Sequence, residues 1–573
     1  MFQRLWVGVW LCVCAPLAAE NVTVTLLATT DLHGHILPYD YFTGKPADRG
    51  LAKLAPAIQQ IRQGNPHTLL VDCGDTIQGS PLETVYQQFV RFGKLPVGLQ
   101  FDGPPFETDP MMLVMNYLRY DAMVLGNHEF NFGLKCLNRA RSDARFPWLS
   151  ANTVAEGAAR PFLPYILRTL GGVKVAVVGI TTPAIPIWEK QENYAGYRFE
   201  PAIPCLARIV RELESKERPD LIIAAVHAGL GRDPATGAPF PGETPGENVA
   251  YDATSVKGLQ AVVFGHSHRE LESAVVNGVL LVQPKNWGAS LARIDFRLEG
   301  SPGHWRLVDR KSQLIAARNV SAPDPEVVRL ARPYHEMTER YLDAPVARSP
   351  RALDGALGRV EDSALVDAIH QVQLHYSKAD VSFTSLFNPR VKVPAGLVTV
   401  RQIAALYIYD NELYAMEGTG KMVREALENA ARYFTGCKDP QCETGPGFNR
   451  SMAGFNFDTA EGVDYEIDLT QPEGRRITKL LWKGKPLRDD QKLRIAVNNY
   501  RAGGSGGYTM FRNAAVVWRA SQEIRDLIIE YFSETGQLPA AADNNWKVVP
   551  EAAHRALVRA AEAEAARTAG GDR

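Results

Sequence analysis

The chain has 573 residues, 45% hydrophobic and 22% charged, and a formal net charge of −1 at pH 7. This length can bury two substantial hydrophobic cores, and the composition is that of a globular protein rather than a disordered or fibrous one. A net charge near zero creates no chain-wide positive field, so neither polymeric nucleic acid nor an anionic membrane is predicted as a partner.

The first nineteen residues have the pattern of a secretory signal peptide. Arg4 precedes an apolar run, and Ala18 and Ala19 form a small-residue cleavage site. The alternatives are a membrane anchor or a buried first strand. The run is shorter than the roughly 20 apolar residues that span a bilayer, so stable membrane insertion is not expected. We predict that residues 1–19 are removed on export and that the mature protein is periplasmic or secreted.

Strand-like apolar runs alternate with helical patterns from about residue 21 to 300, which predicts a mainly parallel α/β domain. Five of these runs end in aspartate, asparagine or histidine, whereas a sixth, starting at Val173, does not. In chain order the side chains at these ends are Asp31, His33, Asp75, Asn127, His128, His227, His266 and His268. Open α/β sheets bind ligands beyond the carboxyl ends of their strands, so we expect these side chains to converge.

The residue types at these strand ends predict a two-metal hydrolytic centre. Asp31 and His33 are two residues apart, and in an extended segment such side chains point the same way, towards one ion. Asp75 is predicted to bridge two ions, and Asn127 contributes a neutral oxygen. Mixed nitrogen and oxygen ligands suit zinc, manganese, iron or cobalt. Two ions about 3.5–4 Å apart clamp a phosphoryl group and activate water, and the adjacent His128 is predicted to stabilise charge or protonate the leaving group.

A structural explanation of each motif is the alternative. A lone Asp-x-His pair is as often a cap or a surface pair, but GNHE and GHSH each follow a strand and support each other. His35 is out of phase with His33, so we expect it to be supporting or incidental. The histidines elsewhere in the chain are predicted to be ordinary packed or surface residues.

The sequence after the first domain predicts a connecting helix and a second domain. Residues 324–343 have a helical pattern that Pro333 is expected to interrupt. We expect this segment to join two domains, the alternative being a helix packed on the first domain. Further helices are predicted near 363–377 and 420–434. The last twenty or so residues predict a charged, alanine-rich helix that is solvated and peripheral.

These patterns define the expected domain boundaries. They are a signal peptide at 1–19, a first domain at 20–318, a linker helix at 319–345, a second domain at 346–550 and a helical tail at 551–573.

The cysteines favour a disulfide over a metal site. Cys437 and Cys442, in CKDPQC, are close enough in sequence to form a small disulfide loop in an oxidising compartment, the alternative being two free thiols. Cys73, Cys136 and Cys205 lie in apolar stretches and are predicted to be packed thiols. The sequence contains no CxxC pair, so a cysteine zinc site is not expected.

The ordered motifs TTDLHGH, GDTIQGSP, GNHEFNFG, VHAGLG and GHSH resemble those of the calcineurin-like metallophosphoesterases, specifically the exported 5′-nucleotidase family. The resemblance covers nearly the whole mature chain. It implies an α/β fold, with an N-terminal α/β/β/α metallophosphoesterase sandwich joined by a helix to a C-terminal 5′-nucleotidase-type α/β domain that binds nucleotides. It also implies two metal sites that share one aspartate. The ligands would be Asp31, His33, Asp75 and His268 for one ion, and Asp75, Asn127, His227 and His266 for the other.

One position departs from many members of this family. They follow GNHEF with aspartate, whereas this chain has Asn131, which can accept a hydrogen bond from His128 but cannot supply a full negative charge. GNHEFN is similar to the 2′,3′-cyclic-nucleotide 2′-phosphodiesterase/3′-nucleotidase branch, as are FNFDTAEGVDYEIDLTQP, VNNYRAGGSGGY and ADNNWKVVP. The resemblance therefore implies an enzyme that opens 2′,3′-cyclic nucleotides to 3′-nucleotides and then releases nucleoside and phosphate.

The same resemblance suggests the residues that bind the nucleotide. Phe457 and Tyr508 lie where the family places a pair of rings around the base, with Phe455 as an alternative to Phe457, although a core role is open for each. Arg390 aligns with a substrate-binding arginine, but SLFNPR lacks the family's glycine run. The functional alternatives are a 5′-nucleotidase or UDP-sugar hydrolase, a hydrolase of sulfur esters, and an inactive nucleotide-binding protein. A monomer is expected.

Overall fold

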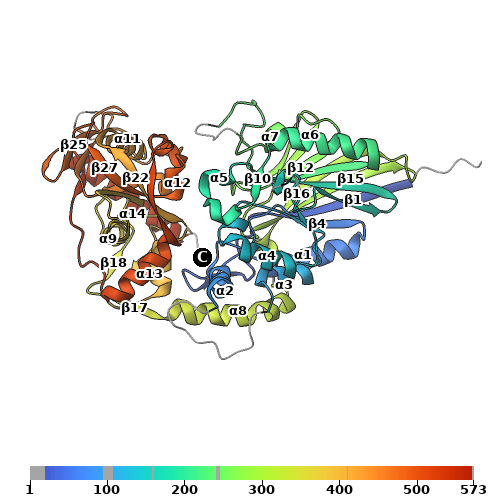
Figure 1. Ribbon diagram of the computed structural model, residues 1–573, viewed down its shortest axis with the longest axis horizontal. Coiled ribbons are helices and arrows are strands. Elements are labelled where there is room, and N and C mark those ends of the chain that lie inside the picture. Colours follow the sequence, from blue (N-terminus) through green and yellow to red (C-terminus); the bar gives the residue numbers. More distant parts are fainter. Residues whose placement is uncertain are drawn as a thin grey trace, which may run out of the picture.

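The computed structural model describes residues 20–93, 107–155, 157, 160–240, 246–409, 411–439, 441–442 and 444–570. The predicted signal peptide lies outside the described residues. Two lobes are joined by a long helix that runs beneath the N-terminal lobe and reaches the edge of the C-terminal lobe (Figure 1). Over the described residues, no helix is both long enough and apolar enough to cross a membrane.

The N-terminal lobe contains two six-stranded sheets. The first has the order β16 (Arg306–Ala316), β15 (Ser290–Gly300), β1 (Glu20–Thr29), β4 (Thr68–Asp72), β5 (Ala122–Val124) and β6 (Trp148–Leu149). The second has the order β13 (Leu271–Val276), β14 (Val279–Gln283), β12 (Ala261–Phe264), β11 (Leu221–His227), β9 (Val173–Thr181) and β8 (Tyr165–Leu170). Within each sheet, the strands that precede the predicted ligands are parallel to one another.

Three apolar layers hold these sheets together. Val71 and Val124 of the first sheet share a buried cluster with Val177 and Ile223 of the second. The other face of the first sheet packs against α1 (Leu51–Gly64), α2 (Pro81–Phe92), α3 (Pro110–Tyr117) and α4 (Gly133–Asp143), and the other face of the second packs against α6 (Ala202–Glu212) and α7 (Ala250–Ala253). The α/β/β/α sandwich is thus confirmed, and the ligand-bearing strands divide between two sheets instead of sharing one.

The connecting helix α8 (Pro325–Asp343) is continuous through Pro333, so the expected interruption is wrong. A proline inside a helix removes one backbone hydrogen bond. Here Val327, Ala331, Tyr334 and Tyr341 form one buried face on both sides of the proline. Tertiary packing of that face stabilises the helix across the missing bond.

The C-terminal lobe has two further sheets. The larger has the order β23 (Asp458–Glu461), β19 (Val381–Ser385), β27 (Lys492–Asn498), β22 (Glu412–Thr419) and β28 (Val516–Glu523). The smaller has the order β26 (Lys485–Pro486), β25 (Ile477–Trp482), β24 (Asp464–Asp468) and β29 (Trp546–Val549). The helices of this lobe include α9 (Ala364–Ser377), α10 (Val400–Leu406), α11 (Gly420–Ala431), α12 (Asn499–Ala502) and α13 (Ile524–Thr535). The helices predicted near 363–377 and 420–434 are confirmed as α9 and α11.

The last helix, α14 (Glu551–Gly570), is not the solvated tail that the sequence predicts. Ala553 and Leu557 are fully buried in the core of the C-terminal lobe. Glu564 also forms an ion pair with Arg450. The charged residues occupy the opposite side of the helix. The prediction failed because the buried face consists mainly of alanine, which gives only a weak hydrophobic pattern.

The cysteines behave as predicted. Cys437 and Cys442 form a disulfide, and Cys73, Cys136 and Cys205 are buried free thiols.

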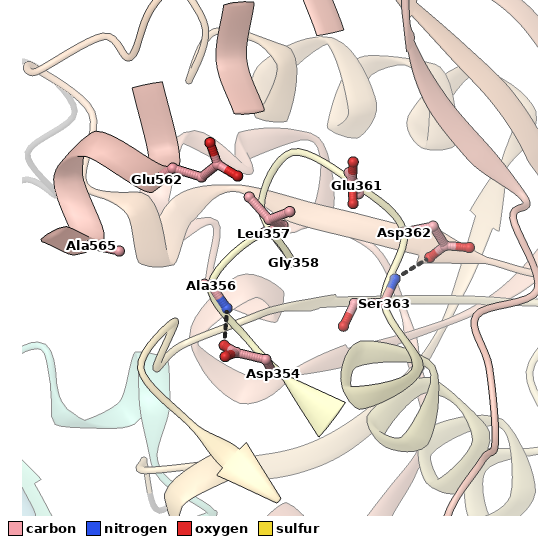
Figure 2. A pocket seen from close by; sticks show the side chains of 9 residues that line it. All are labelled: Asp354, Ala356, Leu357, Gly358, Glu361, Asp362, Ser363, Glu562 and Ala565. Carbon is pink, nitrogen blue, oxygen red and sulfur yellow. Dashed lines mark hydrogen bonds between the residues drawn. The ribbon is translucent and has the colours of Figure 1, made fainter. Parts of the chain in front are cut away.

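A cavity of about 470 Å³ lies between α14 and the segment 354–363. Figure 2 shows Glu562 and Ala565 on one side of it, and Glu361 and Asp362 on the other. Every residue that lines this cavity comes from the C-terminal lobe. It is therefore separate from the ligand-bearing strand ends.

Candidate metal centre

The predicted ligands converge from both sheets of the N-terminal lobe. The ligand atoms of Asp31, His33 and His268 all lie within 4.8 Å of one another, as do those of Asp75, His227 and His266. Asn127 completes the second group, because its Oδ1 atom is 3.1 Å from Nε2 of His227. A third group, of His33, Asp75 and His128, joins the first two. The structure thus brings together all seven side chains predicted to hold metal.

Five of the seven predicted ligands have a left-handed backbone instead of an extended one. Asp31, His33 and Asp75 have φ values of 50°, 48° and 59°, and His266 and His268 have values of 74° and 53°. Left-handed conformations are uncommon for residues other than glycine, and they gather at functional sites. The expectation that Asp31 and His33 point together because they continue a strand is therefore wrong. A tight turn after β1 directs both towards His268.

Two glycines allow the ligand loops to approach closely. A Cβ atom on Gly126 would lie 2.2 Å from Oδ1 of Asp75, and one on Gly265 would lie 1.8 Å from Oγ1 of Thr30. Both distances are far shorter than van der Waals contact. Only glycine therefore fits at Gly126 of GNHE and Gly265 of GHSH, because another loop packs directly against each of them.

Hydrogen bonds orient two of the imidazole rings. Nδ1 of His33 lies 2.8 Å from the carbonyl oxygen of Gln78, and Nδ1 of His227 lies 2.7 Å from that of Cys73. Since a carbonyl oxygen only accepts, each Nδ1 carries a proton, and Nε2 is the nitrogen of each ring that faces the cluster. Burial lowers the pKa of His33 to about 3, with the neighbouring His268 adding to this effect, so this ring is neutral as a metal ligand must be.

Glu129 supports the Asp75 turn, a role that the sequence analysis missed. Its buried carboxylate accepts hydrogen bonds from the backbone N–H groups of Asp75 at 3.0 Å, Thr76 at 2.6 Å and Gly126 at 2.6 Å. These bonds fasten the loop after β4 to the loop after β5. The sequence feature that could have indicated this role is the glutamate in GNHE, an acidic residue that closely follows a buried strand.

His128 lies at the edge of the cluster with one nitrogen turned towards it. Its Nε2 atom is 3.9 Å from Oδ2 of Asp75, and its side chain is 34% exposed. Nδ1 of the same ring is hydrogen-bonded to Oδ1 of Asn131. His128 therefore combines access to solvent with a fixed ring orientation. His35, in contrast, stacks on Trp287 at 5.0 Å and takes a packing role.

The prediction that Phe457 and Tyr508 stack on a base is wrong. Phe457 is 1% exposed and packs among Tyr433, Phe434 and Trp546, and Tyr508 is fully buried. Neither ring presents a free face to a ligand. Aromatic side chains can pack in a hydrophobic core as well as stack on a base, and both of these residues are core residues.

The other predicted substrate residues are accessible. Phe455 is 37% exposed, and Arg390 is an exposed residue whose backbone N–H is bonded to Asn388.

Two tyrosines that the sequence analysis missed are better placed for stacking. Tyr409 and Tyr500 are 40% and 38% exposed, and the ring of Tyr409 lies 6.3 Å from that of Phe455. Tyr500 is on α12, which faces α5 (Ile185–Trp188) of the other lobe in Figure 1. The available signal was a tyrosine among polar residues and glycines, in IYDNE and NNYRAGG, instead of in an apolar run.

Comparisons with known proteins agree with this two-part architecture. The calcineurin-like phosphoesterase family matches residues 24–270, and the 5′-nucleotidase C-terminal domain matches residues 345–513. A trifunctional nucleotide phosphoesterase, YfkN of Bacillus subtilis, is 30% identical over 93% of this chain, which spans 39% of that longer protein. The 2′,3′-cyclic-nucleotide 2′-phosphodiesterase/3′-nucleotidase of Salmonella typhimurium is 27% identical over 94% of this chain and 90% of its own length.

Among solved structures, a 5′-nucleotidase candidate from Staphylococcus aureus has a TM-score of 0.77 at 25% identity. The match covers 92% of this chain and 100% of that one. Both lobes therefore have a counterpart in a single solved chain.

Proposed function

We propose that the substrates of this chain are 2′,3′-cyclic nucleotides and 3′-nucleotides. The chain belongs to the calcineurin-like phosphoesterases with a 5′-nucleotidase C-terminal domain, and it is a metal-dependent phosphoric ester hydrolase. In this proposal the ring phosphodiester is opened to a 3′-nucleotide, and the 3′-phosphate is then removed to leave a nucleoside. The convergence of seven nitrogen and oxygen donors beside Nε2 of His128 supports the hydrolytic chemistry. The choice of substrate class rests on GNHEFN and on the similarity to the Salmonella relative.

The donors fit two divalent cations that share Asp75. Asp31, His33 and His268 would complete one site with it, and the second site would be completed by Asn127, His227 and His266. All seven offer nitrogen or oxygen, which suits zinc, manganese, iron or cobalt. Two such ions would clamp the phosphoryl oxygens and lower the pKa of water, which supplies hydroxide near neutral pH.

His128 would complete the reaction on the leaving side. Hydroxide attacks phosphorus, and the bond from phosphorus to the ribose 2′-oxygen breaks. That oxygen then takes a proton from Nε2 of His128, whose position is held through Nδ1 by Asn131. The same side chains would serve the second step, in which the 3′-oxygen leaves.

A substrate panel tests this assignment. Purified protein with Mn²⁺ is expected to show higher kcat/KM on 2′,3′-cyclic AMP and 3′-AMP than on 5′-AMP, because GNHEFN and the Salmonella relative both point to that branch. Steady-state phosphate and nucleoside release give the three values. Faster turnover of 5′-AMP than of both other substrates would make the chain a 5′-nucleotidase, and nucleotide binding without turnover would make it an inactive binding protein.

We propose that Tyr409 and Tyr500 hold the base, with Phe455 beside them. A base stacked on an aromatic ring gains about 1–3 kcal/mol, so Tyr409→Ala and Tyr500→Ala should each raise KM for 3′-AMP by roughly 5- to 150-fold. Glycerol 2-phosphate has no base, and its hydrolysis should be unchanged. Tyr117→Ala serves as the matched control, since Tyr117 is also 37% exposed but belongs to α3 of the other lobe. Equal losses on both substrates would show that these tyrosines act on the fold or the metal centre.

We further propose that the protein works as a periplasmic or secreted monomer that hydrolyses breakdown products of RNA for scavenging. The apolar N-terminal run of residues 1–19 supports export.

A further inference from the structure

A buried carboxylate lies directly behind Asn131. Oε2 of Glu189 accepts a hydrogen bond of 2.6 Å from Nδ2 of Asn131. Oε1 of Glu189 accepts two more bonds, at 2.7 Å from Nδ2 of Asn193 and at 2.9 Å from the backbone N–H of Lys190. Glu189 is 8% exposed. Donors thus face both of its oxygens.

These bonds determine which way the Asn131 amide points. An asparagine amide has one accepting oxygen and one donating nitrogen, and a carboxylate can only accept. Because Glu189 faces Nδ2, Oδ1 of Asn131 must turn towards His128, to which it is hydrogen-bonded. Nδ1 of His128 then has to be the donor. The other nitrogen of that ring, Nε2, is thereby the one left to face the reacting phosphate.

We propose that Glu189 is a positioning residue, which keeps the His128 ring turned with Nε2 towards the phosphate by holding the side-chain amide of Asn131 in one orientation. This inference rests on the proposed function of His128. Many family members have an aspartate at the position of Asn131, next to the histidine. In this chain the negative charge would instead belong to Glu189, one hydrogen bond further from His128. The unit is then histidine, asparagine and glutamate in series.

Burial and hydrogen bonding act on the charge of Glu189 in opposite directions. Burial raises the pKa of Glu189 to about 7, and the nearby Glu412 carboxylate adds to the rise, while the hydrogen bonds from Asn193, Lys190 and Asn131 oppose it. A protonated Glu189 would have to turn its own O–H towards one of these donors. The arrangement of three donors around two oxygens therefore favours the carboxylate that the proposal requires.

The segment that carries Glu189 is anchored in the other lobe. Nζ of Lys190 lies 2.6 Å from Oε1 of Glu412 on β22, and both side chains are nearly buried. Ile187, from the same segment, lies against Gly503 just after α12. Contacts from the C-terminal lobe thus help to hold Glu189 against Asn131.

Reversing the hydrogen bond tests the proposal. Glu189→Gln introduces an amide nitrogen that faces other N–H donors, or else forces the Asn131 amide to rotate by half a turn. We therefore expect kcat to fall by about 10- to 100-fold, with KM and metal content unchanged. Asn131→Asp opposes two carboxylates and should also lower kcat. In the double variant the new glutamine can donate to the new aspartate, which can still accept from His128. The double variant should therefore recover kcat above the less active of the two single variants.

The control is Glu192→Gln, an exposed glutamate in the same segment that should leave kcat unaltered. All variants are measured in the full chain on whichever phosphoester the unmodified protein hydrolyses fastest, so an incorrect substrate assignment does not affect the outcome. Thermal unfolding and bound metal are recorded for each. Independent losses that multiply in the double variant, or an unchanged kcat in Glu189→Gln, would overturn the proposal.

Discussion

Asp75→Ala is expected to abolish hydrolysis and to remove metal from both sites. Asp75 belongs to the group with His227 and His266 and also to the group with His33 and His128, and its Oδ2 lies 3.0 Å from Nε2 of His227. Loss of a single charge-stabilising donor already costs up to about 10³-fold in kcat, so loss of a shared metal ligand should cost more. Elemental analysis and kcat/KM on 2′,3′-cyclic AMP measure the two effects.

Folding has to be separated from catalysis in this experiment. Asp75 is buried and accepts the backbone N–H of His128 at 2.8 Å, so its removal also perturbs the turn after β5. Asp75→Asn keeps the shape and is the second variant. Asp48→Ala removes an aspartate with 67% side-chain exposure and serves as the control. Full metal content and activity in a folded Asp75→Asn protein would contradict a shared ligand.

His128→Ala is expected to lower kcat on 3′-AMP by about 10²- to 10⁴-fold, the range for loss of a general acid. Metal content should stay unchanged, because the seven proposed ligands remain. The loss should be much smaller on p-nitrophenyl phosphate, whose leaving group departs without a proton. Rates on the two phosphoesters, measured with the same preparation, give the comparison.

The exposed histidine His304 provides the control through His304→Ala. An equal loss on both phosphoesters would indicate that His128 stabilises charge on the phosphoryl group instead of protonating the leaving oxygen. A fall in the metal content of His128→Ala would indicate that His128 is itself a metal ligand.

Several features of the fold were accessible from the sequence because they depend on local patterns. A strand that ends in a polar, metal-type residue is visible in the chain itself, and the structure gathers Asp31, Asp75, His227 and the GHSH histidines at one place. The short spacing of Cys437 and Cys442 likewise predicted their disulfide.

Other features depended on neighbours that come from distant parts of the chain. Phe457 and Tyr508 lie where the family resemblance implies a stacking pair, but Trp546 and other rings enclose Phe457, whereas Tyr409 and Tyr500 are exposed. Pro333 carries a local signal for a helix break that a continuous buried face overrides.

The sequence by itself determined which residue types stand at the strand ends, since that property belongs to single segments. Only the tertiary structure decided that these ends belong to two facing sheets, that Glu129 accepts hydrogen bonds from the Asp75 turn, and that Glu189 accepts one from Asn131. A carboxylate's role depends on which donors surround it once it is buried. The donors here include the backbone N–H of Asp75 at Glu129 and Nδ2 of Asn131 at Glu189, which come from other loops and reach hydrogen-bonding distance only on folding.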